Sequence, residues 1–179
     1  MNLRKALLST CIILSSATSN AAELADLNKV DKPLNTISQE KTPGRVSELL
    51  MNALSLVGVK YKFGGNSPET GLDCSGFVGH VFQNTAGLVL PRSASAISTV
   101  GSKITLNDLR PGDLVFFKTM RKAISHVGIY LGDNRFIHAT SSKTGNVAIS
   151  NMNESYWAKR FTAASRVDLS TPSSVKPVE

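Results

Sequence analysis

The order of sequence periodicities along the chain limits the possible fold more than any other feature. Apolar residues first recur at helical spacing, in segments 45–57, 74–85 and 93–100. The pattern then changes to short β-rich runs separated by turn residues, at 113–118, 126–132, 135–141, 146–151 and 161–167. Helices followed by strands predict an α+β fold, with N-terminal helices packed on a central antiparallel sheet of about five strands.

The first 22 residues are typical of a secretory signal peptide. Arg4 and Lys5 precede a mostly apolar stretch, and small residues suit cleavage after Ala21 or Ala22. Acylation of Cys11 is disfavoured, because most of the apolar run follows this cysteine instead of leading to it. We therefore expect an exported protein, periplasmic or secreted, without a lipid anchor. No later run is long enough for a transmembrane helix.

The 179 residues have room for one folded domain besides the signal peptide. We expect a signal peptide at 1–22, a linker or arm at 23–44, the domain at 45–169 and a disordered tail at 170–179. The net charge of +7 falls to +5 when Arg4 and Lys5 leave with the signal peptide. A basic exported protein suits an anionic polymer such as the cell wall, whereas the dispersed charge argues against nucleic acid.

Removal of the signal peptide leaves Cys74 as the only cysteine, so an internal disulfide is excluded. A lone thiol in an oxidising compartment is either a buried core residue or a nucleophile. Asp73 is the predicted N-cap of a helix that begins at Cys74, and the helix start is expected to favour the thiolate. The small residues Ser75 and Gly76 allow a substrate to approach closely.

A thiol nucleophile needs a base, and the chain has three histidines. His80 lies six residues along the same helix and is expected to face away from Cys74. His126 and His138 lie on two strands joined at Gly132-Asp133-Asn134. A hairpin centred on Asp133 places both histidines on one face, whereas a two-residue turn centred between Asp133 and Asn134 places them on opposite faces. A metal site is not expected, because no CxxC, HxH or HExxH motif is present.

Several motifs together resemble one known family. The segments YKFGG, GLDCSGFV, LPRSAS, LRPGDLVFF, SHVGIYLG and RFIHA occur in the order of the NlpC family of papain-like cell-wall peptidases. The resemblance covers about Val46 to Val167, and MNESYWAKRF at 152–161 further resembles the short murein endopeptidases of enterobacteria. It implies a papain-like fold without a cofactor. The enterobacterial relatives resemble lipoproteins at their N-terminus, whereas this chain lacks a convincing lipobox. Many family members also carry SH3-like wall-binding domains, for which residues 22–44 are too short.

The resemblance assigns roles residue by residue. It implies Cys74 as nucleophile, His126 as general base and His138 as the residue that orients the base. Tyr61 matches a tyrosine that helps to stabilise the oxyanion, and Asp73 and Ser75 match positions that line the substrate groove. Arg92 and Ser93 match a segment near the site.

The implied substrates are the stem peptides of peptidoglycan, cut by a monomeric thiol peptidase. The first expectation is the D-alanyl–meso-diaminopimelate cross-link, and the alternative is the D-glutamyl–diaminopimelate bond. Acyl transfer to an amine on the same fold and a non-catalytic wall-binding module are the competing hypotheses, because a fold does not decide its function.

Overall fold

The computed structural model describes residues 41–120, 123–141 and 145–170. The predicted signal peptide, most of the predicted linker and the tail from residue 171 lie outside these described residues. The helices are α1 (Lys41–Ser55), α2 (Cys74–Ala86), α3 (Ala94–Ile97), the 3-10 turn η2 (Leu106–Asp108) and α4 (Ser155–Ala158). The strands are β1 (Asn66–Ser67), β2 (Gly71–Leu72), β3 (Ser102–Ile104), β4 (Leu114–Phe117), β5 (His126–Gly132), β6 (Arg135–Ala139), β7 (Val147–Asn151) and β8 (Phe161–Arg166).

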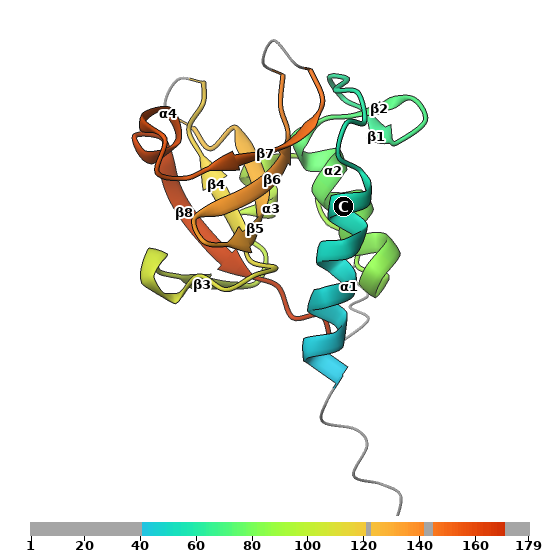
Figure 1. Cartoon of the computed structure of the whole chain (residues 1–179), viewed down its shortest axis with the longest axis horizontal. Coiled ribbons are helices and arrows are strands. Elements are labelled where there is room, and N and C mark those ends of the chain that lie inside the picture. Colours follow the sequence, from blue (N-terminus) through green and yellow to red (C-terminus); the bar gives the residue numbers. More distant parts are fainter. Residues whose placement is uncertain (1–40, 121–122, 142–144, 171–179) are drawn as a thin grey trace, which may run out of the picture. The chain divides into compact units, whose positions relative to one another are not determined.

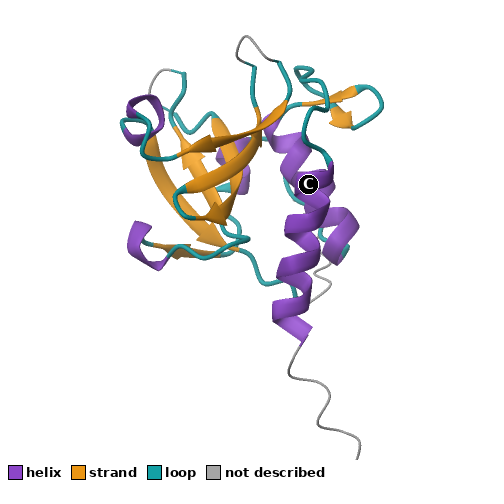
Figure 2. Ribbon diagram, in the orientation of Figure 1, coloured by secondary structure: helices purple, strands orange, loops and turns teal. Residues whose placement is uncertain are grey.

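A six-stranded sheet in the order β3-β8-β4-β5-β6-β7 forms the centre of the domain (Figure 1). Every pairing in it is antiparallel, and the helices α1 and α2 stand beside it (Figure 2). The predicted α+β class and antiparallel sheet are therefore confirmed. The additional strand is β3, which the sequence analysis missed because three residues are too short to show alternation.

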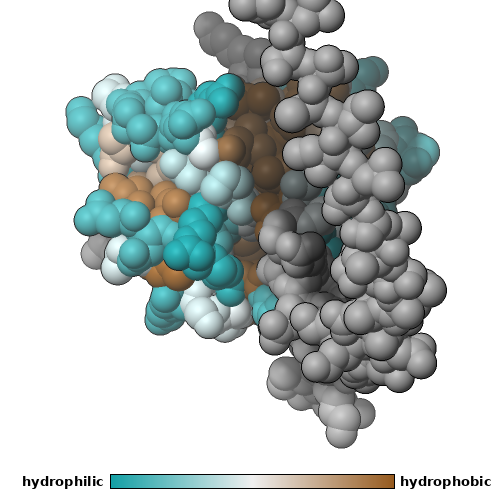
Figure 3. Space-filling view, turned by 60° about the horizontal axis from the view of Figure 1, so that its bottom comes forward, coloured by the Kyte–Doolittle hydropathy of each residue, from teal (hydrophilic) through white to brown (hydrophobic). Residues whose placement is uncertain are grey.

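The two faces of the sheet bury different sets of side chains. Val127 and Ile129 of β5 pack towards α1 and α2, in a large core that also holds Phe77 and Phe82 of α2. Side chains that alternate with these point to the other face of the sheet. There Phe117 of β4 and Phe136 of β6 pack on Trp157 of α4. Seen from the end of the domain that is lowest in Figure 1, apolar residues gather in a band beside a mostly hydrophilic surface (Figure 3).

Helix α2 begins and ends where the sequence predicts. The Asp73 carboxylate accepts a hydrogen bond from the Gly76 N–H at 2.6 Å, which caps the helix start. Gly87 ends the helix in the left-handed conformation, with φ of 67°. The other helical predictions are less accurate: α1 begins at Lys41 instead of Arg45, and α3 is one turn instead of the predicted 93–100.

The β5–β6 hairpin combines the two registers left open by the sequence. Asp133 and Asn134 form a two-residue turn, both with positive φ, as such hairpins require. A bulge between Tyr130 and Gly132 then shifts the pairing by one residue. Beyond the bulge Ile129 pairs with Ile137, so His126 and His138 point to the same face of the sheet.

The segment before Cys74, predicted to be a loop, contains a small ribbon formed by β1 and β2. It packs tightly on the start of α2, since a Cβ atom on Gly76 would lie only 2.1 Å from the Gly65 carbonyl oxygen. A residue larger than glycine at position 76 would therefore push the ribbon away from the helix that carries Cys74.

Candidate active site

Cys74 is the first residue of α2, and it is a free cysteine. Its thiol points to the carbonyl oxygen of Ser125, 4.0 Å from the sulfur, just before β5 begins. Among the described residues no hydrogen bond joins Cys74 to His126, the residue that follows Ser125. The start of α2 and the start of β5 therefore bring the thiol and the predicted base to the same end of the sheet.

The pKa of the Cys74 thiol is raised, against the expectation from its place at a helix start. Burial is the main cause, and the negative charge of Asp73 adds to it. The backbone N–H groups of Val127, Ser75 and Cys74 itself favour the thiolate, but they do not outweigh burial. The resting side chain is therefore a neutral thiol.

His126 and His138 form a direct pair. His126 Nε2 lies 2.8 Å from His138 Nδ1, and His138 Nε2 lies 3.0 Å from the hydroxyl oxygen of Ser150. If His126 Nε2–H donates to His138, then His138 Nε2–H donates to Ser150, and every bond of the chain has one donor and one acceptor. This arrangement leaves Nδ1 of His126 to accept a proton from the thiol.

The histidine pair is enclosed by aromatic rings. His126 stacks on Trp157 with ring centroids 5.5 Å apart, and His138 stacks on Phe136 at 4.7 Å. His138 is 0% exposed and His126 is 8% exposed. Burial lowers the pKa of His126 to about 4 and that of His138 to about 2, so both rings are neutral near pH 7.

Tyr61 packs on the same core cluster as Cys74. Burial raises the pKa of its hydroxyl, and the charges of Cys74 and Asp73 raise it further. These contributions place Tyr61 near both residues and keep its hydroxyl protonated, so that it is able to donate a hydrogen bond to a developing oxyanion.

Arg92 ties the segments around Cys74 together. Its guanidinium donates to the carbonyl oxygens of Gly64 and Gly65 at 3.1 and 3.3 Å, and it pairs with the Asp73 carboxylate at 3.3 Å. The Ser75 hydroxyl lies 2.9 Å from Asp73 Oδ1 and 3.0 Å from the Arg92 carbonyl oxygen. These contacts fix the segment before β1 against the start of α2, and Tyr61 is joined to the same ribbon by its bridge to Leu72 of β2.

Two residues of the sequence analysis lie apart from this group. Ser93 is the N-cap of α3 and accepts from the Ala96 N–H at 3.2 Å. His80, which the sequence places on the same helix as Cys74, is bound within that helix: its Nε2 accepts a hydrogen bond from the Asn84 amide at 2.9 Å.

Three further residues lie at the site without having been predicted from the sequence: Ser150, Trp157 and Ser125. Ser150 lies two residues from Ala148, the register partner of His138, on the strand beside it. Side chains alternate along β7, so Ser150 lies on the same face as Ala148. Pairing of β6 with β7 would therefore have predicted that Ser150 lies near His138. Trp157 stood inside the segment MNESYWAKRF, which contributed only to the family resemblance.

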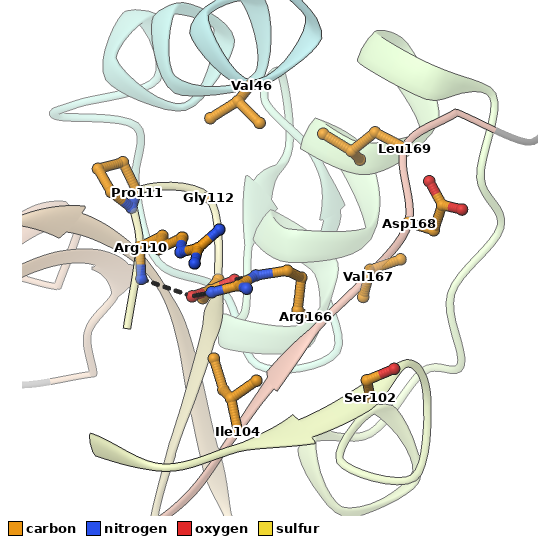
Figure 4. Close-up of a pocket in the computed structure, with 11 residues that line it drawn as sticks. Val46, Ser102, Ile104, Arg110, Pro111, Gly112, Arg166, Val167, Asp168 and Leu169 are labelled. Atoms are coloured by element: carbon orange, nitrogen blue, oxygen red, sulfur yellow. Dashed lines mark hydrogen bonds and ion pairs between the residues drawn. The ribbon is translucent and has the colours of Figure 1, made fainter. Parts of the chain in front are cut away.

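Two cavities of similar size lie at opposite ends of the domain. One, of about 510 Å³, includes His126 in its lining. The other, of about 470 Å³, lies between α1 and the strands β3 and β8, and none of the predicted site residues lines it (Figure 4). Arg166 there forms a bidentate ion pair with the buried Asp113, at 2.7 Å for both contacts. The chemistry of His126 makes the first cavity the one that belongs to the site.

Within the described part of the chain, no group of three or more His, Cys, Asp or Glu side chains is placed to hold a metal ion. No helix of the described residues is long and apolar enough to cross a membrane.

Comparison with known proteins identifies the family. The model of the NlpC/P60 family matches residues 58–166, which include Tyr61, Cys74, His126 and His138. The chain belongs to the NlpC/P60 family. The family resemblance drawn from the sequence motifs is thereby confirmed.

Two curated relatives are similar in sequence to this NlpC/P60 chain over part of their length. Murein DD-endopeptidase MepS/Murein LD-carboxypeptidase of Escherichia coli strain K12 is 47% identical over 110 residues, 62% of this chain and 56% of that protein. Gamma-DL-glutamyl hydrolase of Bacillus subtilis strain 168 is 42% identical over 131 residues, 73% of this chain and 31% of that protein. The chain therefore spans about half of the first relative and about a third of the second.

Solved structures of the family support the fold. An NLP/P60 family protein of Staphylococcus aureus matches with a TM-score of 0.63 and 35% identity, over 69% of this chain and 41% of the other. An NlpC/P60 family protein of Bacillus cereus also matches with a TM-score of 0.63, at 28% identity, over 68% of this chain and 39% of the other.

Proposed function

We propose that this NlpC/P60 chain is a cysteine peptidase that hydrolyses amide bonds in the stem peptides of peptidoglycan. The observation that carries the proposal is the approach of the Cys74 thiol, at the start of α2, to the start of β5, where His126 is hydrogen-bonded to His138 of β6. A nucleophile, a base and a residue that orients the base are the parts that thiol-dependent acyl transfer needs.

In the proposed first step, substrate binding turns the thiol from the Ser125 oxygen to Nδ1 of His126, because catalytic hydrogen bonds often tighten only in the substrate complex. His126 takes the thiol proton while the sulfur forms a bond to the amide carbonyl carbon. His138 accepts a hydrogen bond from Nε2–H of His126 and stabilises the imidazolium. The C–N bond then breaks, His126 returns the proton to the leaving amine, and water hydrolyses the thioester to release the acid and restore the thiol.

The oxyanion of the tetrahedral intermediate would be held by the backbone N–H of Cys74 and by the hydroxyl of Tyr61. The Tyr61 pKa is raised, so this hydroxyl keeps its proton for the hydrogen bond. One such donor is typically worth about 3 kcal/mol in the transition state.

The first choice of bond is the D-alanyl–meso-diaminopimelate cross-link, supported by the 47% identity to the protein named murein DD-endopeptidase MepS. The alternative is the D-glutamyl–diaminopimelate bond, supported by the 42% identity to the protein named gamma-DL-glutamyl hydrolase. The proposal also includes export to the periplasm or the medium, where the net positive charge of the chain would favour the anionic wall.

Mass spectrometry of products from purified cross-linked peptidoglycan tests the function, with wild type and Cys74→Ala in parallel. Conversion of dimeric muropeptides into monomers with intact stems, by wild type only, is the expected result. Products that carry dipeptide stems would indicate cleavage at the D-glutamyl–diaminopimelate bond instead. If Cys74→Ala gave the same products as wild type, or if neither protein changed the wall, the peptidase proposal would be wrong.

A further inference from the structure

The cavity beside His126 is not explained by the catalytic residues alone. It has a volume of about 510 Å³, within the range of ligand-binding pockets. Besides His126, its lining residues are Thr119, Thr140, Ser141, Ala148, Ser150, Glu154, Tyr156 and Trp157. The lining thus comes from β5, β7, α4 and the connections beside β4 and β6, and Cys74, Tyr61 and Arg92 are outside it.

The direction of proton transfer decides which half of a substrate would lie there. After the thiol has attacked, His126 must give its proton to the leaving nitrogen, so the leaving half has to lie on the His126 side of the sulfur. Tyr61, Asp73 and Arg92 instead contact the β1–β2 ribbon and the start of α2: Tyr61 bridges Leu72 of β2, and Arg92 binds Asp73 and the carbonyl oxygens just before β1. The ribbon and α4 lie at opposite sides of the same end of the sheet (Figure 1).

The walls of the cavity have the chemistry of a peptide subsite. Tyr156 is 47% exposed, and it packs edge-on against Trp157 with ring centroids 4.9 Å apart. Arg160 lies over the Tyr156 ring at 3.8 Å from its centroid, which fixes the ring from the other side. Trp157 in turn stacks on His126, so the aromatic wall is continuous with the proposed base.

Glu154 is the charged carboxylate of this lining. One of its oxygens accepts a hydrogen bond from the Asn151 N–H at 3.1 Å, which holds the side chain at the start of α4. A carboxylate suits the N–H groups of a peptide, and it suits the released amine, which leaves neutral with the proton from His126 and becomes an ammonium by taking up a second proton from water.

We propose that this cavity binds the leaving, amine-bearing half of the substrate, with Tyr156 as its contact wall and Glu154 as the partner of the released amine. The inference rests on the proposed peptidase function and adds a second subsite to it. The leaving half would be a peptide segment, here the acceptor stem of a cross-link, because a single released residue would leave most of the cavity unfilled.

Two soluble substrates with the same acyl half test the proposal. One is a cross-linked muropeptide dimer, and the other carries a small fluorogenic amine as its leaving group. Tyr156→Ala is expected to raise KM for the dimer about 3- to 10-fold, the range for loss of an aromatic contact, and to change kcat/KM for the fluorogenic substrate less than twofold. Phe63→Ala is the matched control: this ring is 87% exposed and does not line the cavity, so the ratio between the two substrates should stay as in wild type.

A binding measurement separates a contact from a support of the fold. The Cys74→Ala protein cannot turn over, so calorimetry on that background measures its affinity for the amine-bearing product directly. Tyr156→Ala should weaken this affinity and leave that for the acid product unchanged. Glu154→Gln keeps an acceptor for Asn151, and it should weaken binding of the amine product and reduce its dependence on salt.

The possible results have distinct meanings. An equal loss with both substrates, or no loss with either, would overturn the subsite, because a merely structural role of Tyr156 acts on both leaving groups. If wild type cleaves neither substrate in a Cys74-dependent manner, the peptidase function itself fails, and the subsite fails with it.

Discussion

Burial shifts the two partners of the proposed proton transfer in opposite directions at the scale of single residues. It raises the pKa of the Cys74 thiol and lowers the pKa of the His126 imidazole to about 4. Both shifts favour the neutral thiol and the neutral imidazole over the ion pair. The thiol and the imidazole therefore rest uncharged, and in the proposed mechanism the charges that form during attack would be stabilised by His138 and Tyr61.

The first prediction concerns the acid limb of the pH profile. His126 cannot accept a proton once it is protonated, so activity falls as the pH passes below its pKa. Because this pKa is about 4, the acid limb of kcat/KM should lie well below pH 6.5, the value for an ordinary histidine. The measurement is kcat/KM between pH 4 and 8, with circular dichroism at each pH to verify folding. A limb at pH 6.5 in folded protein would contradict the buried, neutral base.

The second prediction concerns His138. Its imidazole accepts from His126 and is itself held by Ser150, so its removal should cost the hydrogen bond that stabilises the imidazolium. A hydrogen bond to a charged group is worth about 1.5–3 kcal/mol, which predicts a fall in kcat of about 10- to 150-fold for His138→Ala. KM should change little, since His138 is buried away from substrate. Ser150→Ala is the milder companion variant, and a loss through KM alone would argue against an orienting role.

At the scale of the elements, close packing of the β1–β2 ribbon on α2 fixes the helix start that carries Cys74, the proposed nucleophile. The third prediction is that Gly76→Ala impairs both stability and activity, because the new Cβ would lie 2.1 Å from the Gly65 carbonyl oxygen. Overpacking of this kind costs about 1–3 kcal/mol in the free energy of unfolding, which urea denaturation measures. Gly79→Ala is the matched control on α2: nothing lies within 4 Å of its added Cβ, and alanine should stabilise the helix. Equal stability of the two variants would contradict the close contact.

The sequence predicted the elements whose cause is local and missed those whose cause is tertiary. Helix α2 carries its own signals, an N-cap at Asp73 and a glycine at its end, and was predicted almost to the residue. The strand β3 has no pattern of its own and forms only because β8 offers it an edge. The histidine pair was left open between two registers, since the bulge between Tyr130 and Gly132 that decides it has no marker in the sequence.

The same limit applies to the site. The residue types and order of Cys74, His126 and His138 were sufficient to propose a thiol, a base and an orienting group. The raised pKa of the thiol was not predicted, because it depends on how much of the sulfur α2 and β5 bury together. The contact of Trp157 with both histidines joins residues from α4, β5 and β6, and no spacing in the chain indicates it.

At the scale of the whole molecule, the histidine pair makes folding depend on pH. Both histidines have a lower pKa in the folded protein than in the unfolded chain, about 4 and about 2 against an ordinary value of 6.5. Between these values the unfolded chain binds more protons than the folded one. The free energy of unfolding is therefore highest above pH 6.5, and it decreases as the pH falls from 6.5 towards the pKa values of the folded protein. The exposed carboxylates of Glu69 and Asp168 have lowered pKa values, so they act only at more acidic pH.

The fourth prediction is that the free energy of unfolding decreases by about 2 kcal/mol per histidine between pH 7 and pH 5. Such a loss is a large part of the stability of a typical domain, so the midpoint of urea denaturation should fall steeply over this interval. The double variant His126→Gln, His138→Gln has no imidazole to protonate in the core, and its stability should be nearly flat over the same range. A wild type as flat as the double variant would mean that water reaches the histidines, and that the rings of Phe117, Phe136 and Trp157 around them do not exclude the solvent.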